Sequence, residues 1–277
     1  MGKLLKIDME RAFKSRKFIL IVLVEVVYIL VYSWRFLYTA ITSTIPFLKQ
    51  YIGIKCDYIP GAFHYWIGFY NSPFRMILFA VIPLLCAVVY GVEIFLDEKK
   101  HYNIQYFIRT DIRKYYLSKI ITLFVSGGVV AAIPFVLSLY INLMVLPMEA
   151  VNTINNYNFP LSDKLVCSGI MLNHPIIYCL IYILWIFVVY GVINCMTFIF
   201  SFILSNRFVV MIGSYFVYFA SFVLGDFIKG IPLLWKSGHF NQLDKDSMYM
   251  IIIQYAVIVV AVAAMLFCVS RRKRDRL

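Results

Sequence analysis

The chain has 277 residues, of which 62% are hydrophobic and 14% charged, with a net charge of +12 and a mean hydropathy of +0.83. This composition excludes an ordinary soluble globular domain. The basic residues are divided among the flanks of long apolar runs, so they do not form the continuous positive groove expected of a nucleic-acid-binding protein.

Six apolar runs each have about the 20 residues that a helix needs to cross ~30 Å of hydrocarbon. The short alternating segments of a membrane β-barrel are absent from the sequence. We therefore predict an all-α polytopic membrane protein, folded as a single transmembrane domain over residues 1–277. The predicted spans are residues 18–38, 76–96, 120–146, 176–204, 208–227 and 248–269.

Basic residues predict the orientation of these spans. Eighteen of the 26 Lys and Arg residues lie in residues 1–17, residues 97–119, Arg207 and residues 271–277, which all fall on one side. Because basic flanks stay in the cytoplasm, we expect both termini there, in a multi-pass protein of the cell (plasma) membrane. The positive charge also favours contact with anionic membrane lipid.

Residues 1–17 precede the first predicted span. Leu5, Met9 and Phe13 recur at every fourth position, with Leu4 and Ala12 beside them. This spacing predicts an interfacial amphipathic helix with basic residues on its other face. The alternative is that the segment is only the positive flank of the first span.

Glu25 lies near the middle of the first predicted span. An ionisable group at that depth costs ~2.5–3.5 kcal/mol, so we expect it to face protein or a water-filled path. It could be a neutral, hydrogen-bonded group that joins helices, or it could contact a substrate. The other side chains that could line a substrate path, or equally join helices, are Tyr28, Tyr140, Asn142, Asn194 and Tyr215.

Two larger loops, residues 39–75 and 147–175, are predicted on the outer side. The first contains Tyr65 and Trp66, which we expect at the membrane–water interface. Cys56 and Cys167 lie in these two loops and could form a disulfide, which the sequence alone leaves open.

Other features constrain the packing of the predicted spans. Ser126, Gly127 and Gly128 are small enough to let two helices approach closely. Residues 205–207 form a tight turn on the cytoplasmic side. Residues 228–247 are too short and too interrupted to cross the membrane, so we predict an outer, half-buried segment.

Residues 97–119 are a charged and aromatic interruption between the second and third predicted spans. Ile104, Phe107 and Ile108 form an apolar stripe at helical spacing, and Tyr102 and Tyr106 are of a type enriched at protein interfaces. We therefore predict a short cytoplasmic helix that docks on a second protein. The alternative is a helix that lies on lipid.

The order of these elements resembles that of the type-2 family of ABC transporter permeases, of the export type, over essentially the whole chain. In that family the segment after the second span begins with charged residues, continues through an apolar helix and a break, and ends at an Arg and a Gly-Lys pair. The matching residues here are Asp97-Glu98-Lys99-Lys100 for the start, Thr110-Asp111 for the break, Arg113 for the Arg and Ser118-Lys119 for the end.

The resemblance implies a permease subunit whose coupling helix, over residues 103–108, fits a cytosolic ABC ATPase present in two copies. It also implies a second permease copy or a paralogue, because six spans are half of the pathway. ATP and Mg would be bound by the ATPase, and this chain would bind no cofactor. The implied ATPase-docking residues are Glu98, Tyr102, Ile104, Tyr106, Phe107, Ile108 and Arg109. The chain has no G-x-x-x-x-G-K-[ST] motif, which agrees with a non-catalytic transport subunit.

For the cargo, the resemblance favours export of an amphipathic or antimicrobial peptide from a bacterium, with drug, ion or lipid-linked sugar transport as alternatives. Two other classes compete with this interpretation. A channel or membrane scaffold without an ATPase would explain the spans but not the charged segment 97–119, and the other class is an intramembrane enzyme. No H-E-x-x-H or G-x-S-x-G motif supports it, so we predict neither a catalytic nor a metal-binding residue. The residues such an enzyme could use are Glu25, His64, Glu93, His174 and Asp226.

Overall fold

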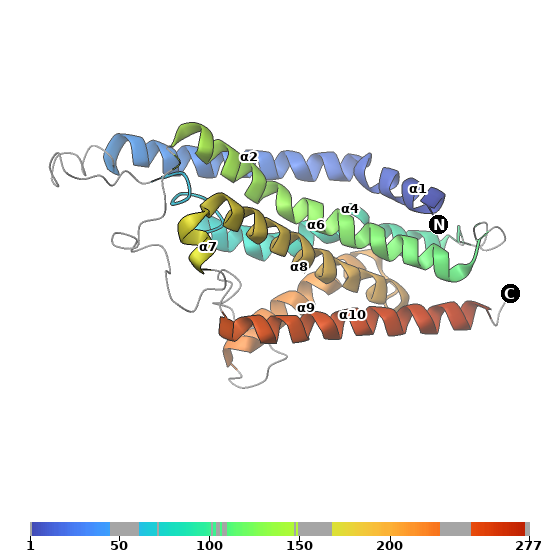
Figure 1. The fold of residues 1–277 in the computed structure, drawn as a ribbon. Helices are drawn as coiled ribbons and strands as arrows, with labels where there is room; N and C mark the ends of the chain where they lie inside the picture. The colour runs from blue at the N-terminus through green and yellow to red at the C-terminus, as the bar shows by residue number, and fades with distance from the viewer. Residues whose placement is uncertain are drawn as a thin grey trace.

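The computed structural model of the chain describes residues 2–44, 61–70, 72–100, 102–103, 106, 110–146, 148, 168–227 and 245–274. These residues form helices and turns, with no strand among them (Figure 1). The helices are α1 Gly2–Phe13, α2 Arg16–Thr39, the π-helical η1 Ala40–Thr44, α4 Pro73–Lys99, α6 Ile112–Val145, α7 Ser168–Asn173, α8 Pro175–Ile203, α9 Arg207–Phe227 and α10 Lys245–Arg274.

Five of these helices, α2, α4, α6, α8 and α10, are long and apolar enough to cross a membrane. The prediction of an all-α, multi-pass membrane protein is confirmed at this level. Helix α9 occupies the fifth predicted span. Its described apolar part, Arg207–Phe219, is shorter than the five long helices. Helix α6 begins at Ile112 rather than at residue 120, so the connection between α4 and α6 is shorter than predicted.

Both termini and the α4–α6 connection lie at the same end of the bundle, which we call the basic end (Figure 1). Residues 61–70 lie at the opposite end, which we call the aromatic end. Polar caps define where three of the long helices begin. Ser15, Ser72 and Asp111 accept hydrogen bonds from the first turns of α2, α4 and α6, respectively, as N-cap residues typically do.

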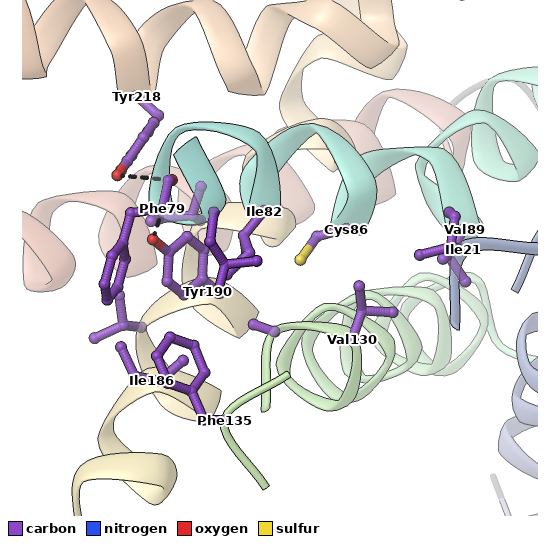
Figure 2. Close-up of a cluster of buried hydrophobic side chains, with 14 of the residues drawn as sticks. Ile21, Phe79, Ile82, Cys86, Val89, Val130, Phe135, Ile186, Tyr190 and Tyr218 are labelled. Carbon is purple, nitrogen blue, oxygen red and sulfur yellow. Dashed lines mark hydrogen bonds between the residues drawn. The ribbon is translucent and has the colours of Figure 1, made fainter. Parts of the chain in front are cut away.

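Helices α6 and α8 pack closely because glycines face the neighbouring backbone. A Cβ at Gly128 would lie 2.7 Å from the carbonyl oxygen of Phe187, and one at Gly191 would lie 2.7 Å from that of Phe124. The close approach predicted for the small residues around Gly127 is therefore confirmed. Beside this contact, Figure 2 shows apolar side chains of α4, α6 and α8 meeting in the core, with Tyr218 of α9 above them.

Residues 61–70 fold back into the aromatic end of the bundle. Trp66 is fully buried, and its Nε1 donates a hydrogen bond to the carbonyl oxygen of Phe135, at 2.9 Å. The backbone N–H of Ile67 donates to Ser138 Oγ, at 3.3 Å, and Tyr32 Oη donates to the carbonyl oxygen of Tyr65, at 2.7 Å. The interfacial position of Trp66 stays a prediction. The structure adds that its ring is buried inside the protein, where its indole N–H finds an acceptor.

Several predicted features lie outside the described residues. They include the possible Cys56–Cys167 disulfide and most of the half-buried segment 228–247. The predicted site residues outside the described part are Ile104, Phe107, Ile108 and Arg109, together with the side chain of Asp226.

Candidate functional site

A buried cluster of charged side chains joins α1 to α4 and α6 at the basic end. Asp8 of α1 is buried, although it belongs to a segment rich in lysine and arginine. Its carboxylate accepts hydrogen bonds from Lys119 Nζ at 2.7 Å, Tyr90 Oη at 2.8 Å and Ser118 Oγ at 2.8 Å. Asp8 therefore anchors α1 to two of the long helices.

Lys119 of α6 is the centre of this cluster and is only 1% exposed. Its Nζ donates to Asp8, to Asp97 at 2.8 Å and to Tyr90 Oη at 2.9 Å. An ammonium group has three N–H donors, so these three acceptors satisfy it fully. The same ammonium lies 5.3 Å from the ring centroid of Tyr115, within the range of a cation–π interaction.

Arg11 extends the cluster along α1. Its guanidinium donates to both carboxylate oxygens of Asp97, at 3.1 and 3.2 Å, and to Glu93, at 3.3 Å. Burial by itself would lower the pKa of Arg11, but the hydrogen bond and the charge of Asp97 raise it overall. Lys17, at the start of α2, donates to the other oxygen of Glu93, at 2.8 Å.

The cluster pairs equal numbers of acids and bases. Its acids are Asp8, Glu93 and Asp97, and its bases are Arg11, Lys17 and Lys119. Removing one member of a buried ion pair costs ~3–5 kcal/mol, because its partner is left charged and without a counter-charge. The arrangement therefore holds four helices in one relative position.

The α4–α6 connection is attached to the ends of α4 and α6 by side-chain hydrogen bonds. Glu98 accepts hydrogen bonds from Asn103 Nδ2, at 2.8 Å, and from Tyr116 Oη, at 2.6 Å. Asn103 is buried, so this part of the connection lies against the bundle.

Three tyrosine rings run from the surface of the connection to Lys119. Tyr102 is 43% exposed, and its ring centroid lies 5.5 Å from that of Tyr106. Tyr106 in turn lies 5.5 Å from Tyr115, whose ring contacts the Lys119 ammonium. We call these three residues the tyrosine row. It links an exposed aromatic residue to the buried charges.

The structure divides the predicted docking residues by orientation. Among those described, Tyr102 faces the surface, Tyr106 is half-buried, and Glu98 is bound to Asn103 and Tyr116 within the connection. Through these two hydrogen bonds, Glu98 holds the connection against the bundle.

The side chains predicted for a substrate path are spread over the bundle. Glu25 and Asn142 are buried, whereas Tyr140 is 57% exposed. Tyr28 donates to the carbonyl oxygen of Phe74, and Asn194 donates to that of Leu123. Tyr215 stacks on Phe219. The contacts of the described residues do not join these six side chains into one cluster.

The sequence interpretation missed the cluster around Lys119, although a signal for it was present. Asp8 is one of two acidic residues among residues 1–17, and it lies four positions from both Leu4 and Ala12. It is therefore on the apolar face of α1, where an acid needs a buried partner. The sequence interpretation named Asp97 and Lys119 only as matches to the family motif. It predicted no role for Tyr90.

The cluster offers bound charges rather than reactive groups. Each carboxylate is paired with a Lys or Arg, and the described residues include no group of three His, Cys, Asp or Glu side chains that could hold a metal ion. None of the protein-family models, curated proteins or solved structures with which the chain was compared matches it.

Proposed function

We propose that this chain is the permease subunit of an ATP-driven ABC exporter and that a separate cytosolic ATPase docks on the α4–α6 connection. The tyrosine row is the observation that carries the proposal. The row leads from the exposed Tyr102 to Tyr115, whose ring contacts the ammonium of Lys119. Lys119 in turn binds Asp8 of α1 and Asp97 of α4. A displacement of the connection would therefore act on three helices at once, because packed interiors transmit strain.

The helices support a six-span arrangement with both termini in the cytoplasm. Helix α9 has 21 residues, enough for ~32 Å at 1.5 Å per residue. The two termini lie at one end of the bundle, as an even number of spans requires (Figure 1). The basic residues of 2–17 and 271–274 lie at that end, which favours its placement on the cytoplasmic side of a bacterial plasma membrane.

In this proposal a second permease copy or a paralogue completes the pathway, and two ATPase subunits bind the ATP and Mg. The proposed cargo is an amphipathic or antimicrobial peptide, which would suit spans that carry Tyr and Asn among apolar side chains. Drugs, ions and lipid-linked sugars are the alternative cargoes. An intramembrane enzyme is less well supported, because Glu93 is already bound to Arg11 and Lys17.

The docking is tested by purifying the tagged full-length chain from its native membrane in mild detergent. Recovered ATPase is identified by mass spectrometry and measured by ATP hydrolysis. We expect Tyr102→Ala to weaken the association about tenfold or more, which corresponds to ~1.4 kcal/mol. Phe107→Ala, in the apolar stripe predicted from the sequence, should weaken it further because truncation of a large aromatic side chain at an interface is often the most costly.

Tyr140→Ala is the matched control, because Tyr140 is an exposed tyrosine on the other half of α6. It should recover as much ATPase as the unaltered chain. A connection that lies on lipid would give full recovery with Tyr102→Ala and Phe107→Ala. That result, or the absence of an ATPase from every preparation, would refute the docking.

A further inference from the structure

Glu25 is buried in the bundle. It lies in α2 and is 1% exposed, and neither of its carboxylate oxygens contacts a donor among the described residues. The other buried acids differ from it. Asp8 and Asp97 are both bound by Lys119. Of the two interpretations drawn from the sequence, the hydrogen-bonded group that joins helices is therefore not supported.

Among the described residues, no Lys, Arg or His of the helices that pack on α2 forms a hydrogen bond with Glu25. Arg75 of α4 donates instead to the carbonyl oxygen of Phe69, at 3.0 Å. Between Arg75 and Glu93, α4 contains no Lys, Arg, His, Asp or Glu, and the same is true of α6 from residue 120 to its end. On α1, Arg11 is paired with Asp97 of α4 and Asp8 is paired with Lys119 of α6, both at the basic end.

The titratable side chain of α4 next to Glu25 is Cys86, which is near enough to interact with its charge. The Cys86 thiol donates to the carbonyl oxygen of Gly127 in α6, at 3.2 Å. Around Cys86, Figure 2 shows apolar side chains: Val130 of α6, Val89 of α4 and Ile21, one turn before Glu25 in α2. On α2 itself, the hydroxyl groups of Tyr28 and Tyr32 donate hydrogen bonds to the backbone carbonyls of Phe74 and Tyr65, respectively.

An ionised carboxylate in this position would be extremely unfavourable. A charged group without a partner is strongly disfavoured in a medium of low dielectric constant, and such groups bind a proton instead. Even the neutral acid is unfavourable there, because its polar atoms have no hydrogen-bond partner among the described residues. Since an apolar residue would avoid this cost, the group is better explained by a function than by stability.

We propose that Glu25 is a proton-binding site inside the membrane. Its carboxyl group holds a proton while α2 is packed against α4 and α6, and it loses that proton to water when α2 separates from them. The O–H bond then breaks, its electron pair stays on the carboxylate, and water accepts the proton. Helix α2 suits this movement, because its apolar stretch is much less embedded in the bundle than those of α4 and α6.

This inference goes beyond the proposed function, because it holds whichever protein or ligand drives α2. The first test is infrared spectroscopy of the full-length protein in lipid nanodiscs at neutral pH. A protonated carboxyl group gives a C=O band distinct from the bands of carboxylates. We expect this band in the unaltered chain and its loss in Glu25→Gln. Absence of the band from the unaltered chain would overturn the proposal.

The second test uses exchange into D2O, which measures whether water reaches the group. The band should shift as the carboxyl proton is replaced by deuterium. A band that never shifts would show a permanently neutral carboxyl, and it would also overturn the proposal. Glu93→Gln is the matched control, because the Glu93 carboxylate forms ion pairs with Arg11 and Lys17. This substitution should leave the band unchanged. Neither measurement involves an ATPase. A negative result would therefore refute the proton-binding site without testing the proposed ATPase docking.

Discussion

The two ends of the bundle bury polar groups in different ways. At the basic end, the ammonium of Lys119 lies between the carboxylates of Asp8 and Asp97. At the aromatic end, the acceptors are backbone carbonyls: Trp66 Nε1 donates to that of Phe135, Tyr32 Oη to that of Tyr65 and the guanidinium of the buried Arg75 to that of Phe69. One end is held by ion pairs and the other mainly by hydrogen bonds to backbone carbonyls among packed rings.

This difference predicts different resistance to opening. Separating a buried ion pair leaves two charges without partners, which costs several kcal/mol. A neutral hydrogen bond contributes only ~0.5–1.5 kcal/mol, because water can replace the lost partner. We therefore expect the basic end to stay assembled while helices move, and the aromatic end to open more readily. Four substitutions test this comparison.

The largest effect is expected for Lys119→Met. The methionine keeps much of the side-chain volume but leaves Asp8 buried without a counter-charge and Asp97 with Arg11 alone. We expect a loss of ~3–5 kcal/mol in the free energy of unfolding. It is measured as a lower midpoint of thermal unfolding in detergent. Lys114→Met, at an exposed lysine of the same helix, should have little effect. Equal midpoints for the two variants would contradict the role given to the charged cluster.

Trp66→Phe should have the largest effect at the aromatic end. It removes the donor to the Phe135 carbonyl and leaves a space where the indole was, which together should cost ~1–3 kcal/mol. The same thermal measurement applies, with Trp34→Phe as the control, because Trp34 is 74% exposed. A loss as large as that of Lys119→Met would remove the contrast between the two ends.

Tyr90→Phe tests the neutral member of the charged cluster. The ring stays, but Asp8 loses one donor and Lys119 loses one acceptor. The ion pairs remain, so we expect a loss of ~0.5–1.5 kcal/mol. Tyr140→Phe serves as the exposed control. If Tyr90→Phe is as harmful as Lys119→Met, the hydroxyl group rather than the ion pairs organises the cluster.

Lys17→Met should have the smallest effect. Its pair with Glu93 is partly exposed, and such pairs contribute ~0–1 kcal/mol. Glu93 also keeps its contact with Arg11. High salt should weaken the Lys17 contribution but have little effect on that of Lys119, because buried pairs are screened much less. A salt-dependent loss in Lys119→Met would indicate that water reaches the cluster.

The sequence by itself determined that the chain is an all-α membrane protein. It also determined the approximate position of the long helices. The predicted span 176–204 corresponds to Pro175–Ile203, and the predicted span 76–96 lies within Pro73–Lys99. These features are local, because a helix that crosses a membrane needs ~20 consecutive apolar residues whatever its neighbours are. The expected packing at Gly127 and Gly128 also followed from residue size.

Tertiary structure alone decided which polar groups meet. Asp8 and Lys119 are 111 positions apart, and nothing in either local pattern specifies their pairing. From its residue type, Trp66 was predicted at the membrane–water interface. Only the fold shows that residues 61–70 turn back into the bundle, where the indole N–H donates to the Phe135 carbonyl of α6. The sequence showed that a carboxyl group at Glu25 is energetically unfavourable, but only the packing of α2 revealed that it has no hydrogen-bond partner in the described part of the chain. Such contacts depend on how each helix is rotated about its axis and against which neighbour it packs, and both are set by the whole bundle.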